Sequence, residues 1–158
     1  LEKQGIKPQN KIDFGIMVEV PATAYTIDTF LPYIDFVSIG TNDLIQYLLA
    51  VDRSNAEVAS LYDDCHPSVI RTLNFVIQSC KKRNIPVSIC GELASSLNAL
   101  PFLVGLGVDT LSLSPAMFLR IKNALRNLTL KQAVNLAQAG ILMSSSTQIK
   151  QLKEDYNK

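Results

Sequence analysis

Short apolar runs alternate with helical periodicities along the chain, and four of these runs predict buried strands. The runs cover residues 12–19, 34–39, 87–90 and 110–113. Each is followed by apolar residues at a spacing of three or four, which is typical of an amphipathic helix. The repeated order of strand and helix predicts an α/β fold whose parallel strands are joined by helical crossovers.

Helices are predicted after every strand and at the end of the chain. They cover residues 24–33, 43–51, 67–83, 97–104, 116–126 and 129–139, and a polar stretch after residue 146 predicts one more. Pro67 and Pro101 suit a first helical turn, and Thr129 is expected to cap the helix that it precedes. The long connection 52–66 contains a short helical turn near residues 58–62, and loops of this length are often functional.

The ends of the four strands share a chemical feature. They carry Glu19, the pair Asn42 and Asp43, the motif Cys90-Gly91-Glu92 and Ser114. A (β/α)8 barrel has about 250 residues and places its active site at the C-terminal ends of its strands, so four strands amount to half a barrel. An open four-stranded sheet of flavodoxin type is the alternative, but it would not explain a functional group at every strand end.

Composition narrows the class of protein. The 158 residues are 47% hydrophobic, enough for one domain with a sizeable core. Fifteen Lys and Arg balance fourteen Asp and Glu, and the only basic run is residues 81–83, so no nucleic-acid partner is expected.

No apolar run approaches the roughly 18 residues of a membrane span, so no membrane insertion is expected. Cys65, Cys80 and Cys90 lack metal-ligand spacing, which predicts reduced thiols and a cytoplasmic protein.

The start of the chain predicts that it is part of something longer. It begins with Leu1 and a polar lead-in, and it carries no signal-peptide pattern. We therefore expect a single fragment, residues 1–158. Its motif-bearing region is 12–126, and the C-terminal helices are 129–158.

The strand ends also predict a metal and phosphate site. Glu19 and Asp43 would follow adjacent strands, which lie about 5 Å apart. Two such carboxylates suit Mg²⁺, which completes its octahedron with water and substrate phosphate. Asn42 and Arg53 would donate hydrogen bonds to that phosphate. Two structural alternatives stay open, because Asn42 and Asp43 could be helix caps only, and Glu19 an ordinary loop carboxylate.

Three motifs carry a resemblance to a known family. They are GIMVEVPA (15–22), SIGTNDLIQYLLAVDRSN (38–55) and CGELA (90–94). In order and spacing, residues 12–126 resemble the C-terminal phosphoenolpyruvate-binding domain of Enzyme I of the bacterial phosphotransferase system, within the phosphoenolpyruvate-utilising enzymes. Pyruvate phosphate dikinase and phosphoenolpyruvate synthase are similar but more distant.

The resemblance implies a role for each candidate residue. Glu19 and Asp43 match the family's Mg²⁺ ligands, and Asn42 and Arg53 match residues that bind the phosphate of phosphoenolpyruvate. Cys90 matches its proton donor and acceptor. The chemistry agrees, because phosphoenolpyruvate that loses its phosphoryl group becomes an enolate needing a proton on carbon, and a thiol with a pKa of about 8.5 can supply it. A free Cys is otherwise most often a small buried hydrophobe, which is the reading kept for Cys65 and Cys80.

The resemblance also implies an architecture and partners. The chain would be the C-terminal half of a (β/α)8 barrel of a phosphoenolpyruvate-protein phosphotransferase, either the sugar-system enzyme or its nitrogen-related paralogue. Such an enzyme passes the phosphoryl group of phosphoenolpyruvate to a His on a separate N-terminal domain, releases pyruvate, and then phosphorylates a carrier protein.

The chain departs from the family in three respects. Ser95 and Ser96 follow the CGELA motif where the family has Gly-Asp, His66 does not match the phosphoryl-accepting His, and the substrate arginines of the first half of the barrel are absent. A non-catalytic module for dimerisation or metabolite sensing is therefore the rival hypothesis, and a pyruvate-forming lyase is disfavoured.

Half a barrel also predicts self-association. Its first and last strands would lack partners and expose the apolar side chains of the barrel interior. Candidates for that interior are Ile16, Val37, Ile39, Ile89 and Leu111. A symmetric homo-oligomer would bury such surfaces.

Overall fold

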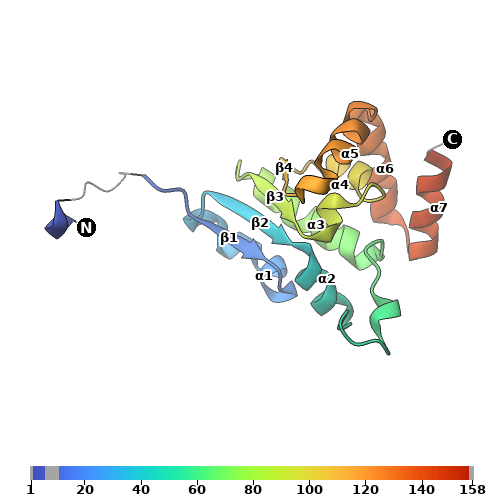
Figure 1. Ribbon diagram of the computed structural model, residues 1–158, viewed down its shortest axis with the longest axis horizontal. Coiled ribbons are helices and arrows are strands. Elements are labelled where there is room, and N and C mark those ends of the chain that lie inside the picture. Colours follow the sequence, from blue (N-terminus) through green and yellow to red (C-terminus); the bar gives the residue numbers. More distant parts are fainter. Residues whose placement is uncertain (1, 6–10, 157–158) are drawn as a thin grey trace.

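The computed structural model describes residues 2–5 and 11–156, in which four parallel strands form one sheet (Figure 1). The strands are β1 (Gly15–Val18), β2 (Phe36–Gly40), β3 (Val87–Cys90) and β4 (Thr110–Leu111). They lie in the order β1-β2-β3-β4. The predicted α/β class and the four parallel strands are confirmed.

The strand order distinguishes the two architectures that the sequence left open. A flavodoxin-type sheet reverses direction after its first strands, so that chain order and spatial order differ. Here each strand pairs with the next one in the chain, as in a barrel wound in one direction. The fold is therefore that of the C-terminal half of a TIM-type barrel.

Besides the strands, the described residues form seven α-helices and five short 3₁₀ turns, one of which precedes β1. The α-helices are α1 (Pro21–Tyr25), α2 (Thr41–Leu49), α3 (Pro67–Lys81), α4 (Leu100–Leu106), α5 (Pro115–Arg126), α6 (Leu130–Leu142) and α7 (Ser146–Tyr156). The 3₁₀ turns are η1 (Glu2–Gln4), η2 (Ile27–Thr29), η3 (Leu31–Tyr33), η4 (Ala59–Leu61) and η5 (Glu92–Ser95). No helix in this part of the chain is long and apolar enough to cross a membrane.

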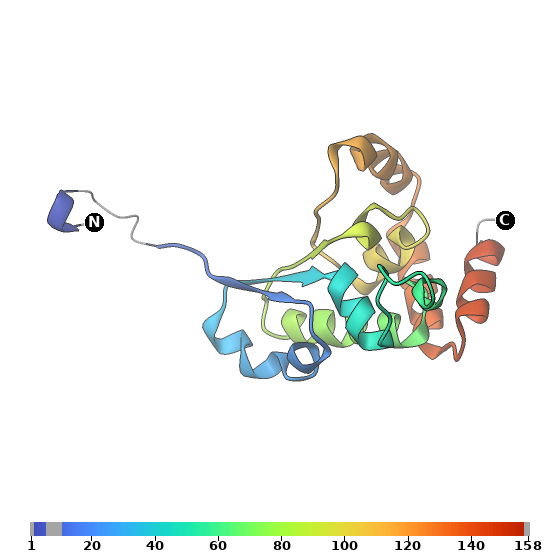
Figure 2. The ribbon, with the colours of Figure 1, turned by 60° about the horizontal axis from the view of Figure 1, so that its bottom comes forward.

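Helices cover one face of the sheet and leave the other open. Figure 2 shows α1 and α3 on the same side of the strands. Side chains alternate along each strand, so one set faces these helices and is buried: Val18, Val37, Ile39, Val87 and Ile89. The opposite set is more exposed and mostly small or polar: Met17, Phe36, Ser38, Ser88, Cys90 and Thr110.

This alternation corrects one sequence expectation. The apolar residues assigned to the barrel interior pack instead against the helices, since Val37, Ile39 and Ile89 belong to the buried core and Ile16 and Leu111 pack against it. The physical reason is that the amphipathic helices present the larger apolar surface, so the most apolar strand positions face them. The open face, which would line a barrel, is left with smaller and more polar side chains.

Several helix boundaries differ from the sequence prediction by a few residues, and two of the differences involve a proline. The helix predicted at residues 24–33 is divided into α1, η2 and η3. The ring of Pro32 cannot continue an α-helix, and the Thr26 hydroxyl donates to the Ala22 carbonyl at 2.8 Å where α1 ends. In the other place, α4 begins at Leu100, with Pro101 in its first turn.

The C-terminal helices pack on the outer side of the barrel half. Helices α4 and α6 approach closely at two glycines, Gly105 against Ala133 and Gly140 against Phe102. Thr129 and Gln132 form a capping box at the start of α6, as expected for a Thr at that position. Helix α7 is anchored by the fully buried Ile149.

Candidate active site at the strand ends

Four of the five predicted site residues lie at one edge of the sheet. Glu19 directly follows β1, Asn42 and Asp43 lie in the first turn of α2, and Cys90 is the last residue of β3. Since the strands are parallel, all of these positions are at C-terminal strand ends. Arg53 comes from the loop that follows α2.

The position of Glu19 depends on Gly40. A Cβ atom at residue 40 would lie 2.9 Å from Oε2 of Glu19 and 3.2 Å from Sδ of Met17. A side chain at residue 40 would have to push these two flexible side chains aside. The half-buried Glu19 carboxylate thus lies against Gly40, at the end of the neighbouring strand β2.

The start of α2 shows that Asn42 and Asp43 are not helix caps. The N-cap is Gly40, without a side-chain cap, so both residues lie inside the first turn and the capping alternative is wrong. Thr41 is fully buried and its hydroxyl donates to the carbonyl of Cys90 at 2.8 Å. The helix start and the end of β3 are thereby joined, with the exposed Asp43 carboxylate facing solvent.

The Cys90 thiol lies on the open face of the sheet, half-buried. It donates to the Ile39 carbonyl at 3.4 Å, and the Ser38 hydroxyl donates to its sulfur at 3.6 Å. The next residue, Gly91, has φ +91°, and a Cβ there would lie 2.6 Å from Oγ1 of Thr41. Glycine is thus required both by the backbone conformation and by the contact with α2.

Glu92 connects the two predicted phosphate-binding residues. Its carboxylate accepts from Nη1 of Arg53 at 3.1 Å, and its backbone N-H donates to Oδ1 of Asn42 at 2.9 Å. Sequence reasoning noted Glu92 at a strand end but gave it no role. The signal available was its place in the CGELA motif beside Cys90.

Tyr62 is a further neighbour that sequence reasoning missed. Burial raises the pKa of its phenol, and the negative charge of Glu92 raises it further while Arg53 opposes the shift. The phenol is therefore a neutral donor at physiological pH. It comes from the long connection after α2, where nothing in the periodicity predicts which side chain turns inward.

The site opens into a small polar pocket of about 380 Å³. It is lined by Asn42, Gly91, Glu92, Ser95, Ser112 and Ser114. Sequence reasoning noted Ser114 at a strand end but missed Ser112. The period-two alternation of β4 could have found it, because Ser112 lies two residues after Thr110 on the open face.

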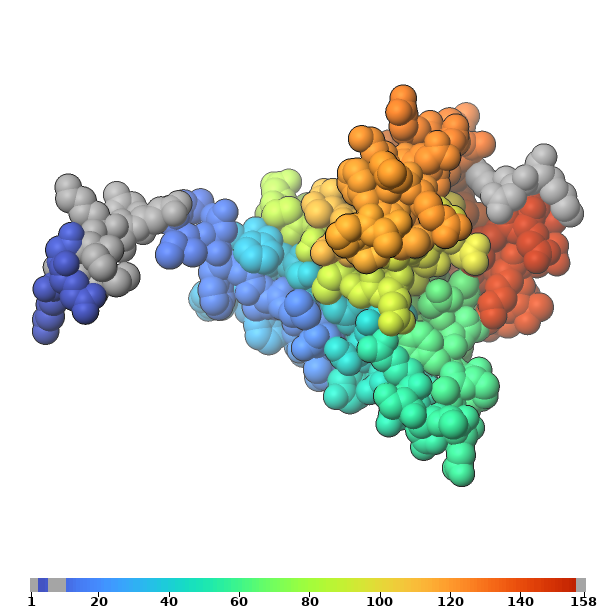
Figure 3. Space-filling model, viewed as in Figure 1, coloured from blue at the N-terminus to red at the C-terminus, as the bar shows by residue number. Residues whose placement is uncertain are grey.

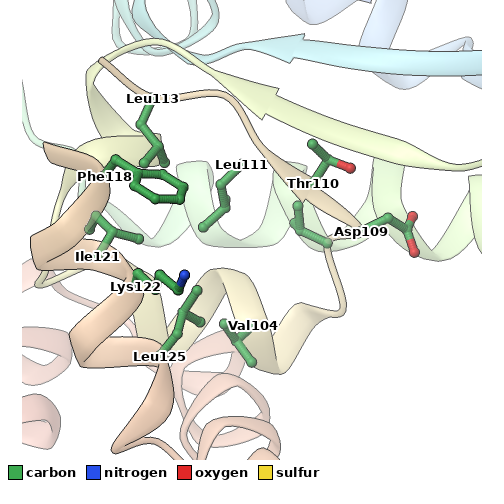
Figure 4. A pocket seen from close by; sticks show the side chains of 10 residues that line it. Val104, Asp109, Thr110, Leu111, Leu113, Phe118, Ile121, Lys122 and Leu125 are labelled. Carbon is green, nitrogen blue, oxygen red and sulfur yellow. The ribbon is translucent and has the colours of Figure 1, made fainter. Parts of the chain in front are cut away.

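A larger pocket of about 540 Å³ lies elsewhere, between β4, α4 and α5 (Figure 4). Its lining is mainly aliphatic and aromatic, with Leu111, Leu113, Phe118, Ile121 and Leu125 pointing toward one another. None of the predicted site residues lines it. Its chemistry differs from the charged strand ends, and we do not assign it to the same site.

The donor set at the strand ends fits a hard divalent cation such as Mg²⁺. Glu19 and Asp43 offer carboxylate oxygens, and within the described residues neither forms a hydrogen bond or an ion pair. A second acidic group, formed by Asp63, Asp64 and Cys65, has its ligand atoms within 4.8 Å of one another. It is already partnered by lysines, with Lys150 3.5 Å from Asp63.

His66 has a structural role. It is the N-cap of α3, and its Nδ1 accepts from the backbone N-H of Ser68 at 3.2 Å. The ring therefore stabilises the start of a helix, and no hydrogen bond among the described residues links it to the strand-end residues.

The chain belongs to the phosphoenolpyruvate-utilising enzyme family, since the family model of the phosphoenolpyruvate-binding domain matches residues 1–130. The similar curated relatives carry the name phosphoenolpyruvate-protein phosphotransferase. The one from Mycoplasma capricolum subsp. capricolum is 40% identical over 156 residues, covering 99% of this chain and 27% of the relative. That of Listeria monocytogenes is 38% identical over 156 residues (99% and 27%), and that of Staphylococcus carnosus 36% over 158 residues (100% and 28%). The chain thus spans little more than a quarter of the length of these relatives.

Proposed function

We propose that this chain is the phosphoenolpyruvate-binding half-site of a phosphoenolpyruvate-protein phosphotransferase. The family match and the names of the relatives support the substrate and the reaction class. The relatives are almost four times as long as this chain, which leaves room in a longer protein for the first half of the barrel and for a domain with a phosphorylatable His.

One observation carries the proposal. Glu19 directly follows β1, Asn42 lies in α2 just after β2, and Cys90 is the last residue of β3, so the three lie at the C-terminal ends of three neighbouring parallel strands. Barrel enzymes place their active sites at this end. A carboxylate, an amide and a thiol gathered there are suited to charge stabilisation, phosphate binding and proton transfer respectively.

Binding of the substrate is assigned to four side chains. Glu19 and Asp43 would hold Mg²⁺, which when bound neutralises negative charge on the substrate. Arg53 would donate to the phosphate. Asn42 uses its Oδ1 to accept from the Glu92 N-H, so its Nδ2 remains as the donor toward the phosphate.

Proton transfer is assigned to Cys90. As the bond between the phosphorus and the enol oxygen breaks, a bond forms from phosphorus to a His nitrogen of another domain, and the enolate is left. The thiol proton then passes from Sγ to the methylene carbon, which yields pyruvate and a thiolate. The phosphoryl group would continue from His to a phosphocarrier protein. The three free thiols suit the reducing conditions of the cytoplasm, where we place the protein.

The test is Cys90→Ala in the full-length protein that carries this segment. We expect the affinity for phosphoenolpyruvate to stay within a few-fold and pyruvate formation to fall by roughly 10² or more, because the thiol acts after the phosphoryl group has left. Cys80→Ala is the matched control, since Cys80 is fully buried in α3 and should change stability only. Unchanged pyruvate formation in Cys90→Ala would remove Cys90 from the mechanism. Binding without any turnover in the wild type would favour the non-catalytic module.

A further inference from the structure

Glu92 contacts both residues that the proposed function assigns to phosphate binding, Arg53 and Asn42. Its carboxylate Oε1 lies 3.1 Å from Nη1 of Arg53, and its backbone N-H donates to Asn42 at 2.9 Å. The two contacts come from different parts of the same residue. Arg53 is therefore held by a carboxylate, while Asn42 is held by a backbone group that any residue at position 92 would supply.

We propose that Glu92 is a resident counter-anion, which holds the Arg53 guanidinium at the site without substrate and releases it when a phosphate binds. The inference rests on the proposed function for the identity of that phosphate. Glu92 is thus a positioning residue that acts through Arg53. Its carboxylate and the incoming phosphate compete for the same cation.

The exposure of the pair makes exchange feasible. The side chains of Arg53 and Glu92 are 39% and 76% exposed. Ion pairs in such surroundings are weak, because water screens the charges and two long side chains lose freedom. A phosphate group carries more charge than a carboxylate and accepts two parallel hydrogen bonds from a guanidinium. The phosphate should therefore displace the carboxylate at little cost.

The polar pocket at the strand ends can accommodate the Glu92 carboxylate after it leaves Arg53. Glu92 lines it together with the hydroxyl-bearing residues Ser95, Ser112 and Ser114. Hydroxyl groups can donate to a carboxylate without adding charge. The backbone contact with Asn42 does not involve the carboxylate, so Asn42 keeps its orientation while the Glu92 side chain moves.

The experiment titrates inorganic phosphate into the 158-residue chain and into Glu92→Gln, Glu92→Asp and Arg53→Gln, with binding followed by NMR. Glu92→Gln should bind phosphate roughly two- to five-fold more tightly, the range expected when a weak competing ion pair is removed. Glu92→Asp keeps the charge and should stay near the wild type. The gain should vanish in Glu92→Gln combined with Arg53→Gln. Glu57→Gln, which removes an exposed carboxylate of the loop after α2, is the control and should change nothing.

Three results would overturn the inference. Weaker phosphate binding in Glu92→Gln would mean that Glu92 orients Arg53 for the anion. Equal phosphate affinity in the two proteins would mean that the Arg53–Glu92 ion pair does not affect anion binding. Absence of binding in both the wild type and Glu92→Gln at about 100 mM phosphate would mean that freed Arg53 forms no anion site.

A parallel titration with phosphoenolpyruvate and Mg²⁺ separates this inference from the proposed function. A Glu92-dependent phosphate site that ignores phosphoenolpyruvate would contradict the proposed function and leave the inference standing. Phosphoenolpyruvate binding that is unaffected by Glu92→Gln would contradict the inference about Glu92 and leave the proposed function standing.

Discussion

Cys80 and Cys90 are both free thiols, but their surroundings give them different chemistry. Cys80 lies on α3 with no exposed surface, and burial, assisted by the charge of Asp109, raises its pKa from 9.0 to about 11. Cys90 lies at a strand end on the open face, half-buried, with a hydroxyl and a carbonyl beside its sulfur. The Cys80 thiol therefore serves only to fill the core, and the Cys90 thiol is the candidate for proton transfer.

The raised pKa of Cys80 predicts a loss of stability at high pH. Above about pH 9 the unfolded chain loses the thiol proton, while the folded chain keeps it up to about pH 11. The folded state then binds more protons, so the free energy of unfolding falls as pH rises, by at most about 1.4 kcal/mol per pH unit from this group. Urea unfolding of the wild type and Cys80→Ala between pH 8 and pH 11 should show a steeper decline in the wild type. Parallel curves would contradict the assignment.

At the residue scale, sequence reasoning placed every candidate at the strand ends or in the following loop, but it missed their partners. Glu19, Asn42 and Cys90 could be located because each follows an apolar run. Tyr62 and the Arg53–Glu92 contact could not, since they depend on how the loop after α2 folds back. The capping alternative for Asn42 failed because Gly40 is the N-cap of α2 and Asn42 lies inside the first turn.

At the scale of elements, the strands and long helices could be predicted from periodicity, while the face of each strand could not. The alternation of Ile16 and Val18 along β1 shows that their side chains lie on the same face of the strand. It does not show whether that face packs against helices or lines the barrel interior. Packing against α1 and α3 decides this. Residues 24–33 illustrate a second limit, because their apolar spacing fits one helix whereas Pro32 and the Thr26 contact divide it.

The packing of α4 on α6 gives a prediction at this scale. Gly105→Ala would improve helix propensity by up to about 1 kcal/mol. The added methyl would however overlap the backbone carbonyl of Ala133, which cannot move without shifting α6. We expect overpacking to dominate and the variant to be less stable by roughly 1 to 3 kcal/mol.

Thermal and urea unfolding can measure this change. Gln138→Ala on the exposed side of α6 is the control and should alter stability little. A stabilised Gly105→Ala variant would show that α4 and α6 are not in close contact.

At the scale of the whole molecule, the sheet has two free edges in the described residues. Strands β1 and β4 end the order, and β4 is only two residues long. Apolar side chains are also exposed in two other places. Met17 and Phe36 are exposed on the open face of the sheet, and Phe118 and Leu119 on α5. Helix α5 projects from the rest of the molecule (Figure 3). The expected interior set was wrong, but these residues provide another apolar surface.

We predict that the isolated chain self-associates through these surfaces. Each fully buried apolar side chain contributes about 1.5 to 3 kcal/mol, and a symmetric dimer would cover several at once. Analytical ultracentrifugation at micromolar concentration should give a dimer or larger species, and Phe36→Ser with Phe118→Ser should shift it toward monomer. A compact wild-type monomer with one cooperative melting transition would refute the prediction.

The central claim, that the strand ends form a phosphoenolpyruvate half-site, is tested most directly by NMR mapping. Mg²⁺ and then phosphoenolpyruvate are titrated into the ¹⁵N-labelled chain, and each backbone amide is followed. Because half a site leaves most of the metal coordination to water, we predict saturable shifts at about millimolar ligand, concentrated at Asn42, Asp43, Gly91 and Glu92, and lost in Asp43→Asn. Shifts confined to the apolar pocket between β4 and α5, or no saturable change at all, would contradict the account.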